Sequence, residues 1–150
     1  HIGLTPQSAT SLGGFKAQGR TAEKARKLVE DARELEAAGC FSVVLEAVPA
    51  AVAAEVTRAL TIPTIGIGAG RECDGQVLVW HDLLGLYAGR APRFVKQYAN
   101  LAPEITAALG RFVADIRSGA FPEEKHTYAM PEEELSVFSG QGVEQAHAER

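Results

Sequence analysis

A glutamate ends a short apolar run of the chain, and this position could give it acid–base chemistry. Glu46 follows residues 41–45, whose apolar side chains suit a strand buried on both faces of a parallel sheet. Ligands bind at the carboxyl ends of strands in barrels and open α/β folds. Poor solvation raises a carboxyl pKa, so Glu46 could accept a proton near neutral pH. The alternative is a solvated acid that caps the helix beginning near Pro49.

A glycine-spaced segment, residues 66–70 (GIGAG), lies about twenty residues after Glu46. It lacks the G-x-G-x-x-G spacing of dinucleotide-binding folds, and no convincing helix follows it, so a Rossmann fold is disfavoured. Glycines at a strand end let a ligand approach the backbone closely, or simply allow a tight turn. Both interpretations stay open.

The histidines are weaker candidates. His1 precedes a polar loop and cannot be interpreted by itself. The adjacent pair His81 and Asp82 could do acid–base work, although such a pair more often caps a helix. His126 and Tyr128 lie in the polar tail with no visible partner. The sequence contains no nucleophile elbow, no P-loop and no histidine pair at metal-binding spacing.

The remaining reactive or charged residues suggest structural roles. Arg90, Arg93 and Lys96 form a small basic cluster, which is typical of a solvated or subunit-contacting face. Cys40 and Cys73 match no metal or redox spacing. We expect Cys40 to pack as a small apolar residue and Cys73 to lie in a polar loop.

Helical and strand patterns alternate through the first hundred residues, which predicts a parallel α/β sheet. Thr21 is a candidate N-cap and Gly39 a helix-ending glycine. The expected helices are residues 21–38, 50–60, 92–100 and 103–118, and the expected strands are 40–45, 64–67 and 76–80, with a fourth that could end at His1. A closed parallel barrel needs eight strands, so we expect half of a barrel or a small open sheet.

The ends of the chain and its overall charge limit the possible functions. The 150 residues carry a net charge of −4, which disfavours nucleic acid or an anionic membrane as a partner. We see no membrane span and no secretory signal, so a cytoplasmic location is the expectation. The first residue is His rather than Met, and we expect a truncated chain. Residues 1–128 form the predicted domain, and residues 129–150 are expected to be a disordered polar tail.

Several long motifs together resemble the ketopantoate (3-methyl-2-oxobutanoate) hydroxymethyltransferase family. The similarity runs from His1 to about Tyr128 and rests on residues 1–8 (HIGLTPQS), 13–20 (GGFKAQGR), 42–46 (SVVLE), 62–70 (IPTIGIGAG), 73–79 (CDGQVLV), 94–101 and 121–126. The resemblance implies a (βα)₈ TIM barrel of the phosphoenolpyruvate/pyruvate superfamily, of which this chain would be the carboxyl-terminal half.

The resemblance also implies a reaction. Family members transfer a hydroxymethyl group from 5,10-methylenetetrahydrofolate to 3-methyl-2-oxobutanoate, giving 2-dehydropantoate for pantothenate synthesis. Mg²⁺ chelates the keto acid, and its ligands belong to earlier strands, so we expect no metal ligand in this chain and no activity from the chain alone. Glu46 would be the proton acceptor and His1 would lie near the bound keto acid.

The family resemblance further implies a homo-oligomer, often a decamer, with small-molecule substrates and neither nucleic acid nor membrane as partner. Two alternatives stay open. One is a 2-oxo acid lyase or mutase of the same barrel superfamily that also acts through an enolate. The other is a non-catalytic half-barrel that needs a partner chain.

Overall fold

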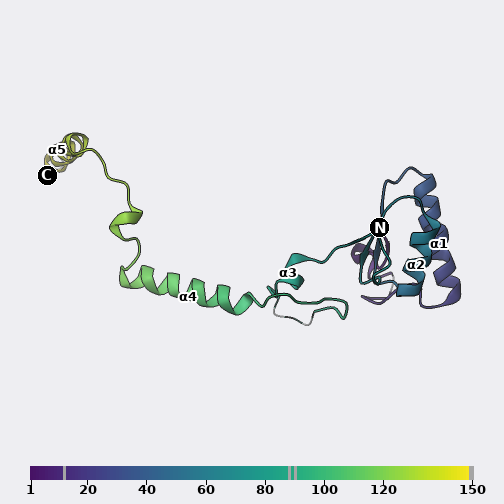
Figure 1. Ribbon diagram of the computed structural model, residues 1–150. Coiled ribbons are helices and arrows are strands. Elements are labelled where there is room, and N and C mark those ends of the chain that lie inside the picture. Colours follow the sequence, from purple (N-terminus) through teal and green to yellow (C-terminus); the bar gives the residue numbers. More distant parts are fainter. Residues whose placement is uncertain (12, 88, 90, 149–150) are drawn as a thin grey trace. The chain divides into compact units, whose positions relative to one another are not determined.

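The computed structural model describes residues 1–11, 13–87, 89 and 91–148, and side-chain environments as far as residue 140. Contacts divide the chain into two compact units, His1–Pro103 and Glu104–Arg150. Figure 1 traces the elements from the purple amino terminus to the yellow carboxyl terminus.

The first unit is built on a parallel sheet whose spatial order follows the sequence. Its strands are β1 (Ile2–Gly3), β2 (Val43–Glu46), β3 (Thr64–Ile67) and β4 (Gly75–Gln76). All three pairings are parallel. A doubly wound sheet reverses its strand order at a switch point, whereas a barrel winds in one direction. The order β1-β2-β3-β4 is therefore that of part of a barrel. The strand that was expected to end at His1 lies instead at Ile2–Gly3, where it pairs with β2.

Helices α1 (Ala22–Ala37) and α2 (Ala50–Ala59) pack together on one face of this sheet (Figure 1). The Thr21 hydroxyl accepts a hydrogen bond from the backbone N–H of Lys24 at 3.3 Å, which confirms the predicted N-cap. Gly39 has φ +94°, the left-handed conformation expected just after a helix. The core between helices and sheet consists of Leu28, Ala32, Val43, Leu45, Val48, Ala53, Val56, Ala69 and Cys73.

Side chains alternate across a strand, so Glu46 and Val44 lie on the sheet face opposite Val43 and Leu45. Val43 and Leu45 are fully buried, whereas Val44 and Glu46 are only partly buried. Parallel sheets are normally covered on both faces. The face that carries Glu46 is therefore the face that a closed barrel would turn inward.

A polar network joins the amino end of β3 to the loop before β4. Thr64 is fully buried, and Asp74 Oδ2 accepts hydrogen bonds from its backbone N–H at 2.8 Å and its hydroxyl at 3.0 Å. The Thr57 hydroxyl oxygen lies 2.8 Å from that of Thr64. Because these bonds favour the ionised carboxylate, they lower the pKa of Asp74.

We expect Asp74→Ala to lower the urea midpoint at pH 7, because it leaves the buried N–H of Thr64 without its acceptor. A lowered pKa stabilises the fold above the carboxyl's unfolded pKa, about 3.9, and this contribution is lost as the pH falls through the lower folded-state value. The difference between wild type and variant should therefore shrink in acid. Glu72→Ala, at an exposed neighbour, is the control; an equal effect there would contradict the prediction.

Two predicted elements are wrong. The strand expected at residues 76–80 ends at Gln76, and Trp80 begins the short helix α3 (Trp80–Leu83). The helix expected at residues 92–100 is irregular. Its backbone bonds elsewhere: the N–H of Tyr98 donates to the carbonyl of Leu83 at 2.8 Å, as the N–H of Leu101 does to that of Leu84 at 3.0 Å. Hydrogen bonds to residues distant in the sequence therefore take the place of the local backbone bonds that a helix would form.

The second unit consists of helices with little sequence-distant packing. Helix α4 (Ala102–Ser118) confirms the predicted amphipathic helix, and the short 3₁₀ turn η2 (Glu124–His126) follows it. A similar short turn in the first unit, η1 (Pro6–Ser8), follows β1. Residues expected to be a disordered tail form α5 (Glu132–Ala148) instead. Three glutamates in its first turn favour a helix there. The domain boundary expected at residue 128 falls inside this unit.

No helix in the part of the chain that the structure describes is both long and apolar enough to cross a membrane.

Candidate active site

The Glu46 backbone is held by both neighbouring strands at the carboxyl end of β2. Its carbonyl oxygen accepts the N–H of Leu4 at 2.8 Å, and the N–H of Ala47 donates to the carbonyl of Ile67 at 2.9 Å. Ala47 has φ +50°, which costs a non-glycine residue about 1 kcal/mol. Backbone strain of this kind is common at functional sites. The turn ends the strand immediately after the carboxylate.

Glu46 and His1 contact each other across the β1–β2 pair. The register sets Gly3 opposite Glu46, and a Cβ at Gly3 would collide with the Glu46 carbonyl oxygen. His1 Nε2 lies 3.1 Å from Glu46 Oε2, and the two side chains are 34% and 14% exposed. With a proton on Nε2 the imidazole donates to the carboxylate and holds it in one orientation. The structure thus brings the two predicted site residues together.

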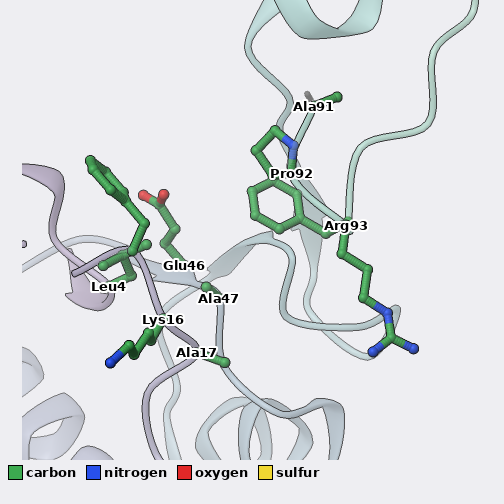
Figure 2. Close-up of a pocket in the computed structure, with 10 residues that line it drawn as sticks. Leu4, Lys16, Ala17, Glu46, Ala47, Ala91, Pro92 and Arg93 are labelled. Atoms are coloured by element: carbon green, nitrogen blue, oxygen red, sulfur yellow. The ribbon is translucent and has the colours of Figure 1, made fainter. Parts of the chain in front are cut away.

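Glu46 faces a cavity of about 590 Å³. Phe15, Pro92 and Phe94 supply apolar walls, and Lys16 and Arg93 also line it. Figure 2 shows the carboxylate of Glu46 directed into the open space, while the charged ends of Lys16 and Arg93 point away from it. Neither cation therefore neutralises the carboxylate.

Burial raises the pKa of the Glu46 carboxyl above its usual range, and desolvation is the cause. A carboxylate with a raised pKa is a stronger base than an ordinary one once it is ionised. Glu46 is therefore a partly buried carboxyl with a raised pKa rather than a fully solvated one, and its role as proton acceptor stays a prediction.

The described residues do not make a metal centre by themselves. No group of three or more His, Cys, Asp or Glu side chains that could hold a metal ion occurs among residues 1–140 apart from the undescribed positions 12, 88 and 90. Mg²⁺ requires several oxygen ligands in near-octahedral geometry. Glu46 and His1 alone do not meet that requirement.

The glycine run serves turns and packing. Gly70 has φ +86° and packs against Ala50 at the start of α2, where a Cβ would lie 2.5 Å from the Ala50 Cβ. Gly68 has φ +68°, and a Cβ there would lie 2.5 Å from the ring of Phe94. The tight-turn interpretation therefore holds for Gly70, and Gly68 makes room for an aromatic wall of the cavity.

His81 and Asp82 both lie in α3 and do not line the Glu46 cavity. The described side chains give α3 no cap hydrogen bond, so the expected capping role is also not seen. The ring of His81 instead packs edge-on against Trp80, with centroids 4.6 Å apart. His126 Nδ1 accepts the backbone N–H of Glu123 at 3.2 Å, which is a local structural role.

The described members of the predicted basic cluster, Arg93 and Lys96, have different surroundings. Arg90 lies outside the described residues, Arg93 lines the cavity, and the Lys96 ammonium lies 4.9 Å from the ring centroid of Tyr98. Cys73 lies in the loop before β4, as expected, but its side chain is buried in the core, whereas Cys40 is only partly buried.

The sequence analysis assigned no site role to four residues that line the cavity, although it named Arg93 as part of a basic cluster. They occur as two pairs of an aromatic and a basic residue, Phe15-Lys16 and Arg93-Phe94, in loops that follow β1 and β4. They come together only because both loops lie at the carboxyl end of the sheet.

Comparison with known proteins gives one consistent result. The family model for ketopantoate hydroxymethyltransferase matches residues 1–124. The chain is 55% identical over 141 residues to the 3-methyl-2-oxobutanoate hydroxymethyltransferase of Geobacillus sp. (strain WCH70), which covers 93% of this chain and 50% of the relative. It is 58% identical over 134 residues to the protein of the same name from Oleidesulfovibrio alaskensis, and the aligned region covers 89% of this chain and 46% of the relative.

The Clostridioides difficile relative of the same name is 53% identical over 135 residues, which covers 90% of this chain and 49% of the relative. The chain thus spans about half the length of the curated relatives it matches. These similarities agree with the partial-barrel topology and with the motifs found in the sequence. The chain belongs to the ketopantoate hydroxymethyltransferase family.

Proposed function

We propose that this chain forms the carboxyl-terminal half of a 3-methyl-2-oxobutanoate hydroxymethyltransferase, a one-carbon transferase of pantothenate synthesis. Its substrates would be the keto acid and 5,10-methylenetetrahydrofolate. The observation that carries the proposal is the partly buried carboxylate of Glu46, which has a raised pKa and faces an open cavity at the carboxyl end of a barrel-type sheet. Family membership supplies the reaction in which such a base is needed.

Glu46 would take the proton from C3 of the keto acid. The electron pair of the broken C–H bond forms the C2–C3 double bond of an enolate, and C3 then bonds to the methylene carbon of the folate. As C3 bonds to the methylene carbon, one of its two C–N bonds breaks, and that nitrogen takes up the proton that Glu46 removed. Water then displaces the second nitrogen: its oxygen forms the new C–O bond and its proton goes to that nitrogen, which gives 2-dehydropantoate and tetrahydrofolate. Removal of water from around Glu46 raises its basicity for the first step.

His1 would keep the Glu46 carboxylate in position. Its Nε2 contact at 3.1 Å engages Oε2, which leaves Oε1 for the substrate proton. Direct contact between His1 and the keto acid remains part of the proposal. Mg²⁺, where bound, would stabilise the enolate charge as a Lewis acid. Because the described side chains of this chain do not form a cage for it, we expect its ligands to come from the other half of the barrel.

A cytoplasmic, homo-oligomeric enzyme belongs to the same proposal. Helix α4 carries an exposed apolar stripe that consists of Ile105, Leu109, Phe112, Val113 and Ile116. An exposed apolar patch of this kind marks a surface that contacts another protein surface. Sedimentation of the full-length protein measures the assembly.

The pH dependence of proton exchange at C3 tests the proposed base. Glu46 must be ionised to accept a proton, so the exchange rate should fall as the pH decreases. Because the pKa of Glu46 is raised, the midpoint of this fall should lie above the ordinary glutamate pKa of about 4.3. The measurement is deuterium incorporation into 3-methyl-2-oxobutanoate by the full-length enzyme across pH. An acid limb at or below the ordinary value would contradict a desolvated base.

A further inference from the structure

Ala47 directly follows the proposed base and has a backbone conformation that alanine rarely adopts. Its φ of +50° makes it the one non-glycine residue with a positive φ in the part of the chain that the structure describes. The residue is buried, with 8% of its surface exposed. A glycine would adopt this left-handed conformation without a clash between Cβ and the backbone. Ala47 therefore carries a methyl group at a position where the backbone alone would favour glycine.

Hydrogen bonds from three separate segments hold this turn. The N–H of Ala47 donates to the carbonyl of Ile67 in β3 at 2.9 Å, and the carbonyl of Ala47 accepts the N–H of Gln18 at 2.9 Å. The carbonyl of Glu46 accepts the N–H of Leu4 at 2.8 Å. Strained conformations persist where the surrounding structure over-determines them in this way. The three bonds therefore fix the backbone on both sides of Ala47.

One of these bonds connects the turn to the wall of the cavity. Residues 15–17, which line the cavity, directly precede Gln18. Gly19 follows with φ +75°, and a Cβ there would lie 2.6 Å from Leu28 Cδ1 in α1. The loop is thus packed against the core at Gly19 and hydrogen-bonded to Ala47 at Gln18. The turn beside the base and the cavity wall are therefore parts of one hydrogen-bonded arrangement.

The methyl group of Ala47 lies where two hollows adjoin. Ala47 lines both the cavity that Glu46 faces and a second hollow of about 360 Å³. Figure 2 shows Ala47 at the base of the Glu46 side chain, with the carboxylate directed into the cavity. A Cβ confines a residue to a narrow left-handed region, whereas glycine moves through a wide one. Loss of the methyl group would therefore loosen the turn and let water reach the base of the Glu46 side chain.

The described cavity lining and ion pairs place three ionisable side chains around Glu46. His1 Nε2 lies 3.1 Å from Glu46 Oε2. Lys16 and Arg93 line the cavity from the loops after β1 and β4, and their charged ends point away from the carboxylate (Figure 2). A substitution at Ala47 removes none of these groups, so it changes the turn and the methyl group without changing a charge.

We propose that Ala47 is a positioning residue for the base. Its left-handed turn directs the Glu46 carboxylate into the cavity, and its methyl group holds the turn in one conformation and keeps water from the base of that side chain. This role rests on the proposed function and deepens it, because it names the residue that sets the direction and the hydration of the base. The strain at Ala47 then serves the site rather than the stability of the fold.

The variant Ala47→Gly in the full-length enzyme separates positioning from folding. Glycine relieves the strain, so the urea midpoint should stay equal or rise. Exchange at C3 at saturating keto acid should slow about tenfold while KM stays unchanged, because a small misplacement of a reacting group is costly. Added water around Glu46 should also move the acid limb of exchange down toward the ordinary glutamate pKa of about 4.3.

Two further variants make this result specific. Ala47→Cys keeps the Cβ and a small apolar side chain, so it should retain most of the exchange rate and the wild-type acid limb. Ala38→Gly is the matched control, at an exposed residue after α1 that has a right-handed φ of −75°. It should leave exchange unchanged.

An infrared titration that needs no reaction distinguishes this inference from the proposed function. The band of the protonated Glu46 carboxyl, identified by its absence in Glu46→Gln, gives the pH midpoint of that group directly. A lower midpoint in Ala47→Gly than in wild type supports the role of Ala47. An equal midpoint, wild-type exchange in Ala47→Gly, or an equal loss in Ala47→Cys would overturn it. Absence of exchange in wild type would refute the proposed function instead, and the infrared midpoints would still decide the role of Ala47.

Discussion

In the full-length enzyme, Glu46→Gln should slow proton exchange at C3 of 3-methyl-2-oxobutanoate by about 10²–10⁴-fold or more, the usual contribution of a positioned base. The amide cannot accept the proton at physiological pH. Its oxygen can still accept a hydrogen bond from His1 Nε2, so the local structure should persist. Deuterium incorporation followed by proton NMR measures the rate.

Binding measurements and a matched variant make this result specific. The keto acid should still bind to Glu46→Gln, because the substitution preserves the size of the side chain and removes only its charge and basicity. Glu55→Gln, at an exposed glutamate of α2 that pairs with Arg58, should exchange at the wild-type rate. Wild-type exchange in Glu46→Gln would remove this residue from the base role.

The second large effect is expected from the 150-residue chain by itself, which should show no exchange above the solution background. In the described part of the chain no cluster of ligands could hold a metal ion, and Glu46 stands on a sheet face that its own helices do not cover. Without a group that stabilises the enolate, a base alone has little catalytic power.

The comparison is made at equal concentrations of chain and full-length enzyme. Circular dichroism of the isolated chain shows whether its helices persist during the assay. Exchange by the isolated chain at the rate of the full-length enzyme would show that the catalytic apparatus is complete in these residues, and would contradict a division of the site between two halves of a barrel.

Local sequence signals located the elements whose ends depend on their own residues. Thr21 and Gly39 mark the ends of α1 because a side-chain cap and a left-handed glycine act within one helical turn. β3 has the predicted bounds because its short apolar run is enclosed by proline and glycine. Glu46 was found for a related reason, since a single acid after a buried strand is visible in the sequence alone.

Tertiary structure decided the features that depend on contacts between distant residues. Residues 92–100 are irregular because the N–H groups of Tyr98 and Leu101 bond to carbonyls near α3, which no local pattern reveals. His1 meets Glu46 only through the parallel register of β1 on β2. The sequence thus determined which group could act as a base. Strand pairing and loop packing decided what surrounds it, because those interactions join segments that lie tens of residues apart.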